Sequence, residues 1–230
     1  MKASTPSLVL FFVTSTLAVL FRLGGYEMTE LCCRSVIVPS LFIYYFVSNN
    51  YRISAYKIII FLALFIRDVL NVIKIKESAF WAFICVLFVY VLLLNVAFKE
   101  VKKFKFDLKD SASILIIFLG IGTICYSVLN LKLENLELNF FWYVIFGIVL
   151  SLLSIVSILN YTKNGNHVFF SALLMCICYM ISDIFFVVFK FYFYTRAFAL
   201  ISLITQFLSY FLMVNYFIEK DRLVEEIYEV

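Results

Sequence analysis

Charged residues, proline and glycine are all scarce in this chain of 230 residues. Asp, Glu, Lys and Arg make up only 15% of the sequence, whereas soluble domains carry about 25%. Two prolines and six glycines exclude an architecture dominated by linkers or low-complexity segments. Hydrophobic residues reach 65%, and the mean hydropathy is +1.04. The composition therefore excludes a water-soluble domain and indicates a polytopic membrane protein.

Long charge-free runs divide the chain into segments of membrane-spanning length, which is about 20 residues for a helix. They do not alternate between apolar and polar residues, as the strands of a membrane barrel would. The stretch 53–73 is equally apolar, although it contains Arg67 and Asp68. We therefore expect eight transmembrane helices, at about 6–22, 35–49, 56–73, 79–98, 111–131, 140–160, 167–190 and 196–218.

These spans predict an all-α bundle that forms one transmembrane domain over 1–218, followed by a short charged cytoplasmic tail over 219–230. With eight spans, eleven Lys and Arg residues lie on the N-terminal side and seven on the other side. This bias predicts that both termini are cytoplasmic. We expect a multi-pass protein of a bacterial inner membrane. Basic loops beside an anionic leaflet explain the net charge of +4, so no nucleic-acid partner is expected.

Metal-binding residues are few and poorly spaced. His167 is the only histidine, and none of the six cysteines has the spacing of a zinc site. The sequence therefore predicts neither a metal site nor another cofactor.

Three ionisable residues lie within the apolar spans: Arg67 and Asp68 in the third, and Asp183 in the seventh. Such residues are costly in lipid and need a partner or a function. Both aspartates fall in the outer portions of their spans, so we expect them at one depth. One interpretation is an ion pair with Arg67 that holds helices together. The other is chemical: one carboxyl group stays protonated as a general acid while the other remains ionised.

Several polar residues are predicted to join these aspartates. They are Ser182, Tyr90, Thr205, Gln206 and Tyr210, with Arg34 and Arg196 near the same membrane surface as candidates for binding a phosphate. Residues 63–74 also resemble residues 178–190, at an offset of half the chain. Such an internal repeat is found in some transporters, and it keeps a small transporter among the alternatives.

Three segments resemble the YhhN-like membrane proteins, the family that includes lysoplasmalogenases. ISDIFFVVFKF at 181–191 resembles the family's serine-aspartate helix, which ends in a basic residue and phenylalanine. RSVIVPSLFIYY at 34–45 is similar to a proline-containing segment of the second span. LFIRDVLNV at 64–72 resembles a glycine-aspartate helix, with Arg67 in the glycine position.

The resemblance implies an eight-helix hydrolase that cleaves the vinyl ether of a lysophospholipid, releasing a fatty aldehyde and a glycerophospho-alcohol. It implies Asp68 and Asp183 as catalytic residues, and a membrane lipid as the partner. The alternatives are a catalytically silent relative that binds a lipid or a partner protein, a small transporter, and a membrane-embedded sensor. The oligomeric state stays open.

Overall fold

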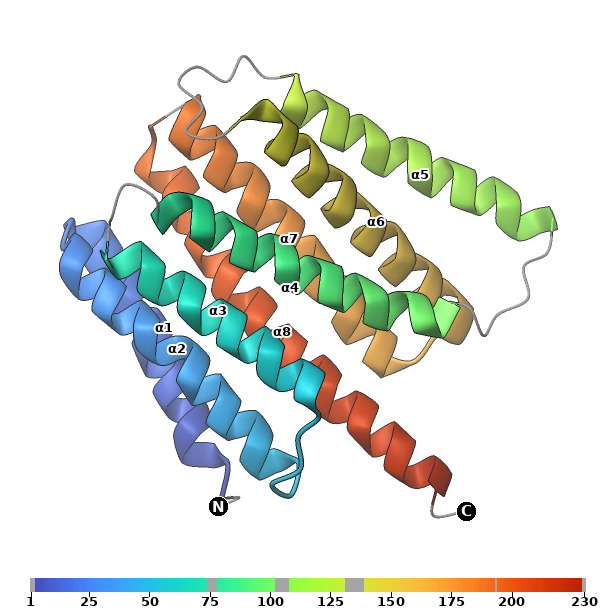
Figure 1. Ribbon diagram of the computed structural model, residues 1–230, viewed down its shortest axis with the longest axis horizontal. Coiled ribbons are helices and arrows are strands. Elements are labelled where there is room, and N and C mark those ends of the chain that lie inside the picture. The colour runs from blue at the N-terminus through green and yellow to red at the C-terminus, as the bar shows by residue number, and fades with distance from the viewer. Residues whose placement is uncertain (1–2, 74–77, 102–107, 131–138, 193, 229–230) are drawn as a thin grey trace.

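The computed structural model describes residues 3–73, 78–101, 108–130, 139–192 and 194–228 (Figure 1). The fold is an all-α bundle, and the described residues contain no strand. Its eight helices are α1 (Thr5–Gly24), α2 (Glu27–Ser48), α3 (Ala55–Ile73), α4 (Ser78–Val101), α5 (Leu108–Leu129), α6 (Phe140–Asn164), α7 (His167–Phe191) and α8 (Arg196–Tyr228).

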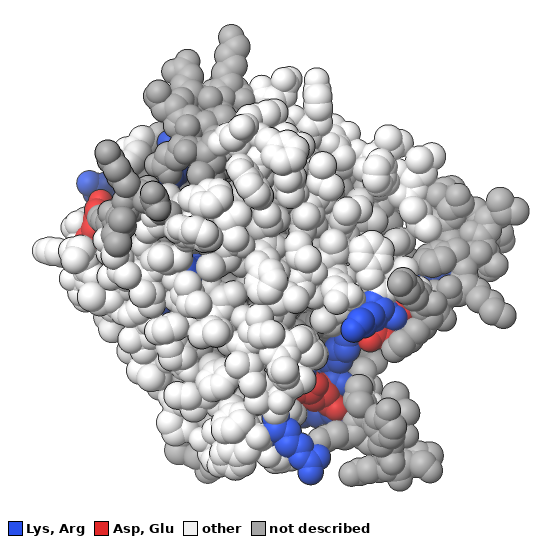
Figure 2. Space-filling model, in the orientation of Figure 1, with Lys and Arg blue, Asp and Glu red and all other residues white. Residues whose placement is uncertain are grey.

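The predicted helical bundle is confirmed. Among the described residues, six helices (α1, α2, α4, α6, α7 and α8) are long and apolar enough to cross a membrane. Helix α3 has 19 residues and carries Lys57, Arg67 and Asp68, and the apolar part of α5 covers Ile114–Leu129. Charged residues gather at the margins of the face drawn in Figure 2, and its centre is almost free of charge. The chain is therefore a multi-pass membrane protein.

The helices form a ring with one helix outside it. Helix α1 packs on α2, α2 on α3, α3 on α4, α4 on α6, α6 on α7 and α7 on α8, which returns to α1 and α2. Helix α5 lies at the edge of the bundle and packs on α6 (Figure 1). A Cβ on Gly147 of α6 would lie 2.9 Å from Cys125 Sγ of α5, so glycine permits this close approach.

Both termini lie at one end of the bundle, which we call the termini end; the opposite end is the far end (Figure 1). Lys102, Lys103 and Lys105, which contribute to the predicted orientation, lie outside the described residues. The cytoplasmic position of the termini therefore stays a prediction.

Two helices, α2 and α8, extend farthest beyond the spans predicted from charge-free runs. Helix α2 begins at Glu27 rather than at 35, and its first turn carries Glu27 and Glu30, which suit a helix N-terminus. Helix α8 runs without a break past 218 to Tyr228. The charged tail predicted from 219 thus starts within a helix, and residues 219–221 contact other helices.

Those contacts attach the extension of α8 to the bundle at three points. Asp221 bonds Lys57 of α3, Lys220 lies 3.1 Å from Glu100 of α4, and Ser171 of α7 donates a hydrogen bond to Glu219 at 3.1 Å. The first turn of the tail is docked rather than free in solvent.

Candidate functional site

A network of charged side chains crosses the far half of the bundle. We define it as Arg22 of α1, Glu30 and Arg34 of α2, Arg67 and Asp68 of α3, and Asp183 of α7, together with Tyr90, Gln206 and Tyr210. Three cations and three carboxyl groups make its formal charge balanced.

Glu30 forms the outermost link of this network. Its residue is 2% exposed, and its carboxylate lies 3.1 Å from Arg22 Nη1 and 3.6 Å from Arg34 Nη1. The Glu30 carboxylate thus links Arg22 of α1 to Arg34, one turn further along α2. Glu30 and Arg34 lie four residues apart on one helix, so their opposite charges compensate each other in this part of α2.

Asp68 lies deeper and is 3% exposed. Its Oδ1 is 3.9 Å from both Arg34 Nη2 and Arg67 Nη1, yet among the described residues this oxygen has no hydrogen-bond partner. Two arginines within ion-pair distance favour the ionised carboxylate. Asp68 therefore lies within ion-pair distance of two cations, at longer distances than a direct hydrogen bond.

Arg67 connects α3 to α8. Its guanidinium donates to the hydroxyl of Tyr210, which is 1% exposed. Gln206, one turn earlier, accepts from Arg34 at 3.3 Å and donates to Tyr210 Oη at 2.8 Å. With the Gln206 amide turned over, its oxygen instead accepts from Arg67 and Tyr210. In either orientation, the arginines of α2 and α3 meet the polar face of α8.

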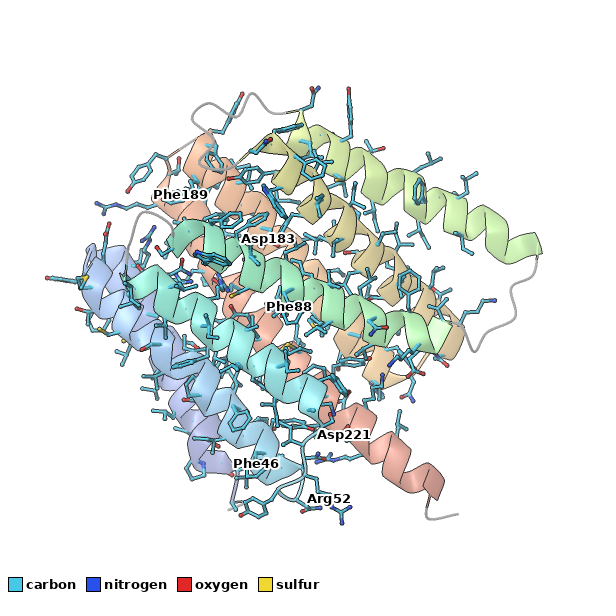
Figure 3. The ribbon with its side chains drawn as sticks, viewed as in Figure 1. Phe46, Arg52, Phe88, Asp183, Phe189 and Asp221 are labelled. Atoms are coloured by element: carbon cyan, nitrogen blue, oxygen red, sulfur yellow. The ribbon has the colours of Figure 1, made fainter. Side chains whose placement is uncertain are left out.

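Asp183 is placed differently from Asp68. Its Oδ2 accepts a hydrogen bond from the Tyr90 hydroxyl at 2.7 Å, and no described residue forms an ion pair with it. The Tyr90 ring packs against Phe146 and Tyr179, at centroid distances of 5.3 and 4.9 Å. Asp183 is half-buried, and Figure 3 shows it in the half of the bundle opposite Asp221.

A small cavity of about 80 Å³ lies beside Asp183 between α5, α6 and α7. Apart from Asp183, its lining is almost entirely apolar, and it includes Val128, Phe146, Leu150 and Val187. Asp68 does not line it. The two aspartates therefore do not face a shared cavity.

Of the residues singled out from the sequence, the structure links Arg34 with Asp68, Gln206 and Tyr210, and it separately pairs Tyr90 with Asp183. It does not bring Ser182 and Thr205 into the network. Ser182 and Ser202 donate to each other's carbonyl oxygens at 3.0 and 2.8 Å, which links α7 to α8. Thr205 donates to the carbonyl of Ile201 in its own helix at 2.7 Å. Their hydroxyls are thus satisfied by backbone.

Arg196 is exposed and forms no hydrogen bond or ion pair with a described residue of the network, but it lines a second cavity at the far end together with Arg22 and Glu30. Sequence reasoning missed Arg22 and Glu30 because both fell outside or at the edge of the predicted spans. The signal that was present is the Glu30–Arg34 spacing, which places opposite charges one turn apart. Within the described part of the chain, no three His, Cys, Asp or Glu side chains gather as a metal site requires.

Comparisons with family models, with curated proteins and with solved structures found no match to this chain. The function is therefore argued from the geometry of the network and its cavities.

Proposed function

We propose that the protein is a YhhN-like hydrolase of a bacterial inner membrane that cleaves the vinyl ether of lysoplasmalogens. The observation that carries the proposal is the contrast between the two aspartates. Asp68 lies 3.9 Å from two arginines, whereas Asp183 accepts a hydrogen bond from Tyr90, forms no ion pair with any described residue and lines an apolar cavity. Carboxyl groups in such different environments divide acid and charged roles between them.

The reaction begins when the Asp183 carboxylic acid donates its proton to the enol-ether carbon farther from the oxygen. This step forms an oxocarbenium ion and leaves Asp183 as a carboxylate beside it. Tyr90 and the nearby charge of Arg67 stabilise that carboxylate, and Asp68 holds Arg67 in place. Water then adds to the carbon next to the oxygen and returns a proton to Asp183. The hemiacetal breaks its carbon–oxygen bond to give the fatty aldehyde and the glycerophospho-alcohol.

The apolar lining beside Asp183 suits the hydrocarbon chain of such a substrate. The vinyl ether lies at the end of the alkyl chain next to the glycerol. A carboxyl group in the wall of an apolar cavity is therefore suitably positioned to protonate it when the chain is bound. The substrate is a membrane lipid, and α5, which forms one wall of the cavity, packs on the bundle through α6.

A lipid-binding protein without catalysis is the second candidate. One observation favours it: among the residues that line this cavity, Asp183 alone carries a carboxyl group, so a bound alkyl chain would meet no second carboxylate there.

Aldehyde release from a lysoplasmalogen by the purified protein in nanodiscs tests the proposal. The parent protein is expected to release aldehyde, and Asp183→Asn is expected to lower the rate by about 10²- to 10⁴-fold, the usual contribution of a general acid. Glu219→Gln, which changes a carboxylate at the termini end, is the matched control and should keep the parent rate. A folded parent protein that binds the lipid but releases no aldehyde favours the second candidate.

A further inference from the structure

A second cavity, of about 250 Å³, opens at the far end of the bundle. It lies between the turn from α1 to α2 and the turn from α7 to α8, and its lining includes Arg22, Glu30, Phe189, Tyr194 and Arg196. It has room for about eight water molecules at roughly 30 Å³ each. Its lining shares no residue with the cavity beside Asp183.

The two arginines of this cavity are held in different ways. Arg22 is 3.1 Å from Glu30, and its guanidinium lies 5.6 Å from the centre of the Phe189 ring. Phe189 in turn packs on Tyr194, with ring centres 4.9 Å apart, at the rim. Figure 3 shows Phe189 at this end of the bundle. Arg22 is thus positioned by a carboxylate on one side and an aromatic ring on another.

Arg196 is exposed, and no ion pair joins it to any described residue. It is the first residue of α8, whose first turn contains no acidic side chain. The positive end of the helix dipole therefore adds to the charge of Arg196. Glu27 also lines the cavity, but it is engaged in an interaction of its own.

Glu30 does not by itself neutralise the arginines of the cavity, because its other carboxylate oxygen lies 3.6 Å from Arg34 Nη1. An anion that entered the cavity would meet Arg196 without displacing a carboxylate, and it would meet Arg22 by exchange for the contact of Arg22 with Glu30. Glu30 would then retain Arg34. The cavity therefore offers the side chains of two arginines to an added negative charge.

We propose that this cavity binds a phosphate group, with Arg196 and Arg22 as its ligands. The planar guanidinium of arginine matches phosphate oxygens in a bidentate geometry. The phosphate belongs either to a lipid head group or to a free phosphate ester. The proposal does not depend on aldehyde release, because the two cavities share no lining residue and Asp183 does not line this one.

Isothermal titration of the purified protein in a phosphate-free maltoside detergent tests this site. The probes are inorganic phosphate, sn-glycerol 3-phosphate and a single-chain glycerophospholipid, each at matched ionic strength. Arg196→Gln and Arg22→Gln are expected to weaken binding at least tenfold. Arg222→Gln, which removes another exposed arginine of α8 at the opposite end, is the control and should bind like the parent.

Binding of the lipid alone assigns the site to a head group, and binding of either soluble probe assigns it to a free phosphate or phosphate ester. Both outcomes support the site. It is overturned if no probe binds, if Arg196→Gln binds as well as the parent, or if Arg222→Gln loses as much affinity as Arg196→Gln. Arg22→Lys, which keeps the charge beside Glu30, separates loss of binding from loss of folding, because it should retain the parent's thermal stability.

Discussion

The two ends of the bundle hold their buried charges in different ways. At the termini end, Lys57 is 1% exposed and bonds to Asp221 and to the Tyr45 hydroxyl at 3.1 Å. The rings of Tyr45, Tyr56 and Phe217 surround its ammonium group at 5.2 to 5.5 Å. We call Lys57, Asp221, Tyr45 and Asn49 the clamp.

Both carboxylate oxygens of Asp221 accept hydrogen bonds within the clamp. Its Oδ2 accepts from Tyr45 at 2.6 Å and from Asn49 at 3.0 Å, and its Oδ1 accepts from Lys57. The carboxylate of Asp68 at the far half has two arginines at 3.9 Å and an oxygen without a hydrogen bond among the described residues.

The comparison separates two uses of buried charge. A fully hydrogen-bonded ion pair fixes α8 against α2 and α3, whereas a loosely held one leaves donors and acceptors free for a ligand. We interpret the clamp as structural and the network as the functional site. The following variants test that distinction, from the largest expected effect to the smallest.

Lys57→Met breaks the clamp and leaves Asp221 without its cation. Breaking a buried pair costs about 3–5 kcal/mol, and we expect about 3 kcal/mol because the Asp221 side chain is 25% exposed. Denaturant unfolding in detergent measures the loss. The double variant Lys57→Met with Asp221→Leu should recover most of the stability, because no unpaired charge remains. Equal losses of stability in the single and double variants would show that the unpaired charge of Asp221 is not the cause of the destabilisation.

Arg67→Gln removes one of the two cations beside Asp68 and the donor to Tyr210. We expect a smaller cost of about 2 kcal/mol, typical of a hydrogen bond that involves a charged group, because Arg34 still faces Asp68. The same unfolding assay compares it with Lys57→Met. A loss larger than that of Lys57→Met would contradict the assignment of the network as the less structural of the two.

Tyr90→Phe removes the hydrogen bond to Asp183 and keeps the ring between Phe146 and Tyr179. A loss of about 1 kcal/mol corresponds to a rate of aldehyde release about fivefold lower. Initial rates in nanodiscs measure it, with Tyr179→Phe, a neighbouring tyrosine, as the control. An unchanged rate in Tyr90→Phe would remove Tyr90 from the proposed reaction.

Ser182→Ala removes one of the two reciprocal hydrogen bonds between α7 and α8. Hydrogen bonds between helices in membranes contribute about 0.6 kcal/mol on average. The variant should lose stability by that small amount and keep the parent rate of aldehyde release. A loss of activity without a loss of stability would return Ser182 to the site that the sequence predicted for it.

The sequence predicts the helices well because lipid requires each span to satisfy its own backbone, so long apolar runs become helices. The prediction from the sequence was wrong about the start of α2 and the end of α8, because charged residues continue the helix at both places. Glu30 is matched by Arg22 and Arg34, and Asp221 by Lys57, which is 164 positions away. Pairing over such a separation is a property of the packed bundle.

The site was predictable only in part. An aspartate or arginine within an apolar span signals a buried polar group, and this signal pointed to Asp68, Asp183 and Arg67. The hydroxyls of Ser182 and Thr205 give the same signal in the sequence, but they bond to backbone carbonyls. Side-chain rotamers and helix rotation decide between these outcomes, and a one-dimensional pattern contains neither.

The most direct test compares aldehyde release by Asp183→Asn with that by the double clamp variant, Lys57→Met with Asp221→Leu, both in nanodiscs and both checked for thermal stability. The account predicts that Asp183→Asn stays folded and loses its activity, while the clamp variant keeps the parent rate. Release of aldehyde by Asp183→Asn at the parent rate would contradict the assignment of the network as the functional site.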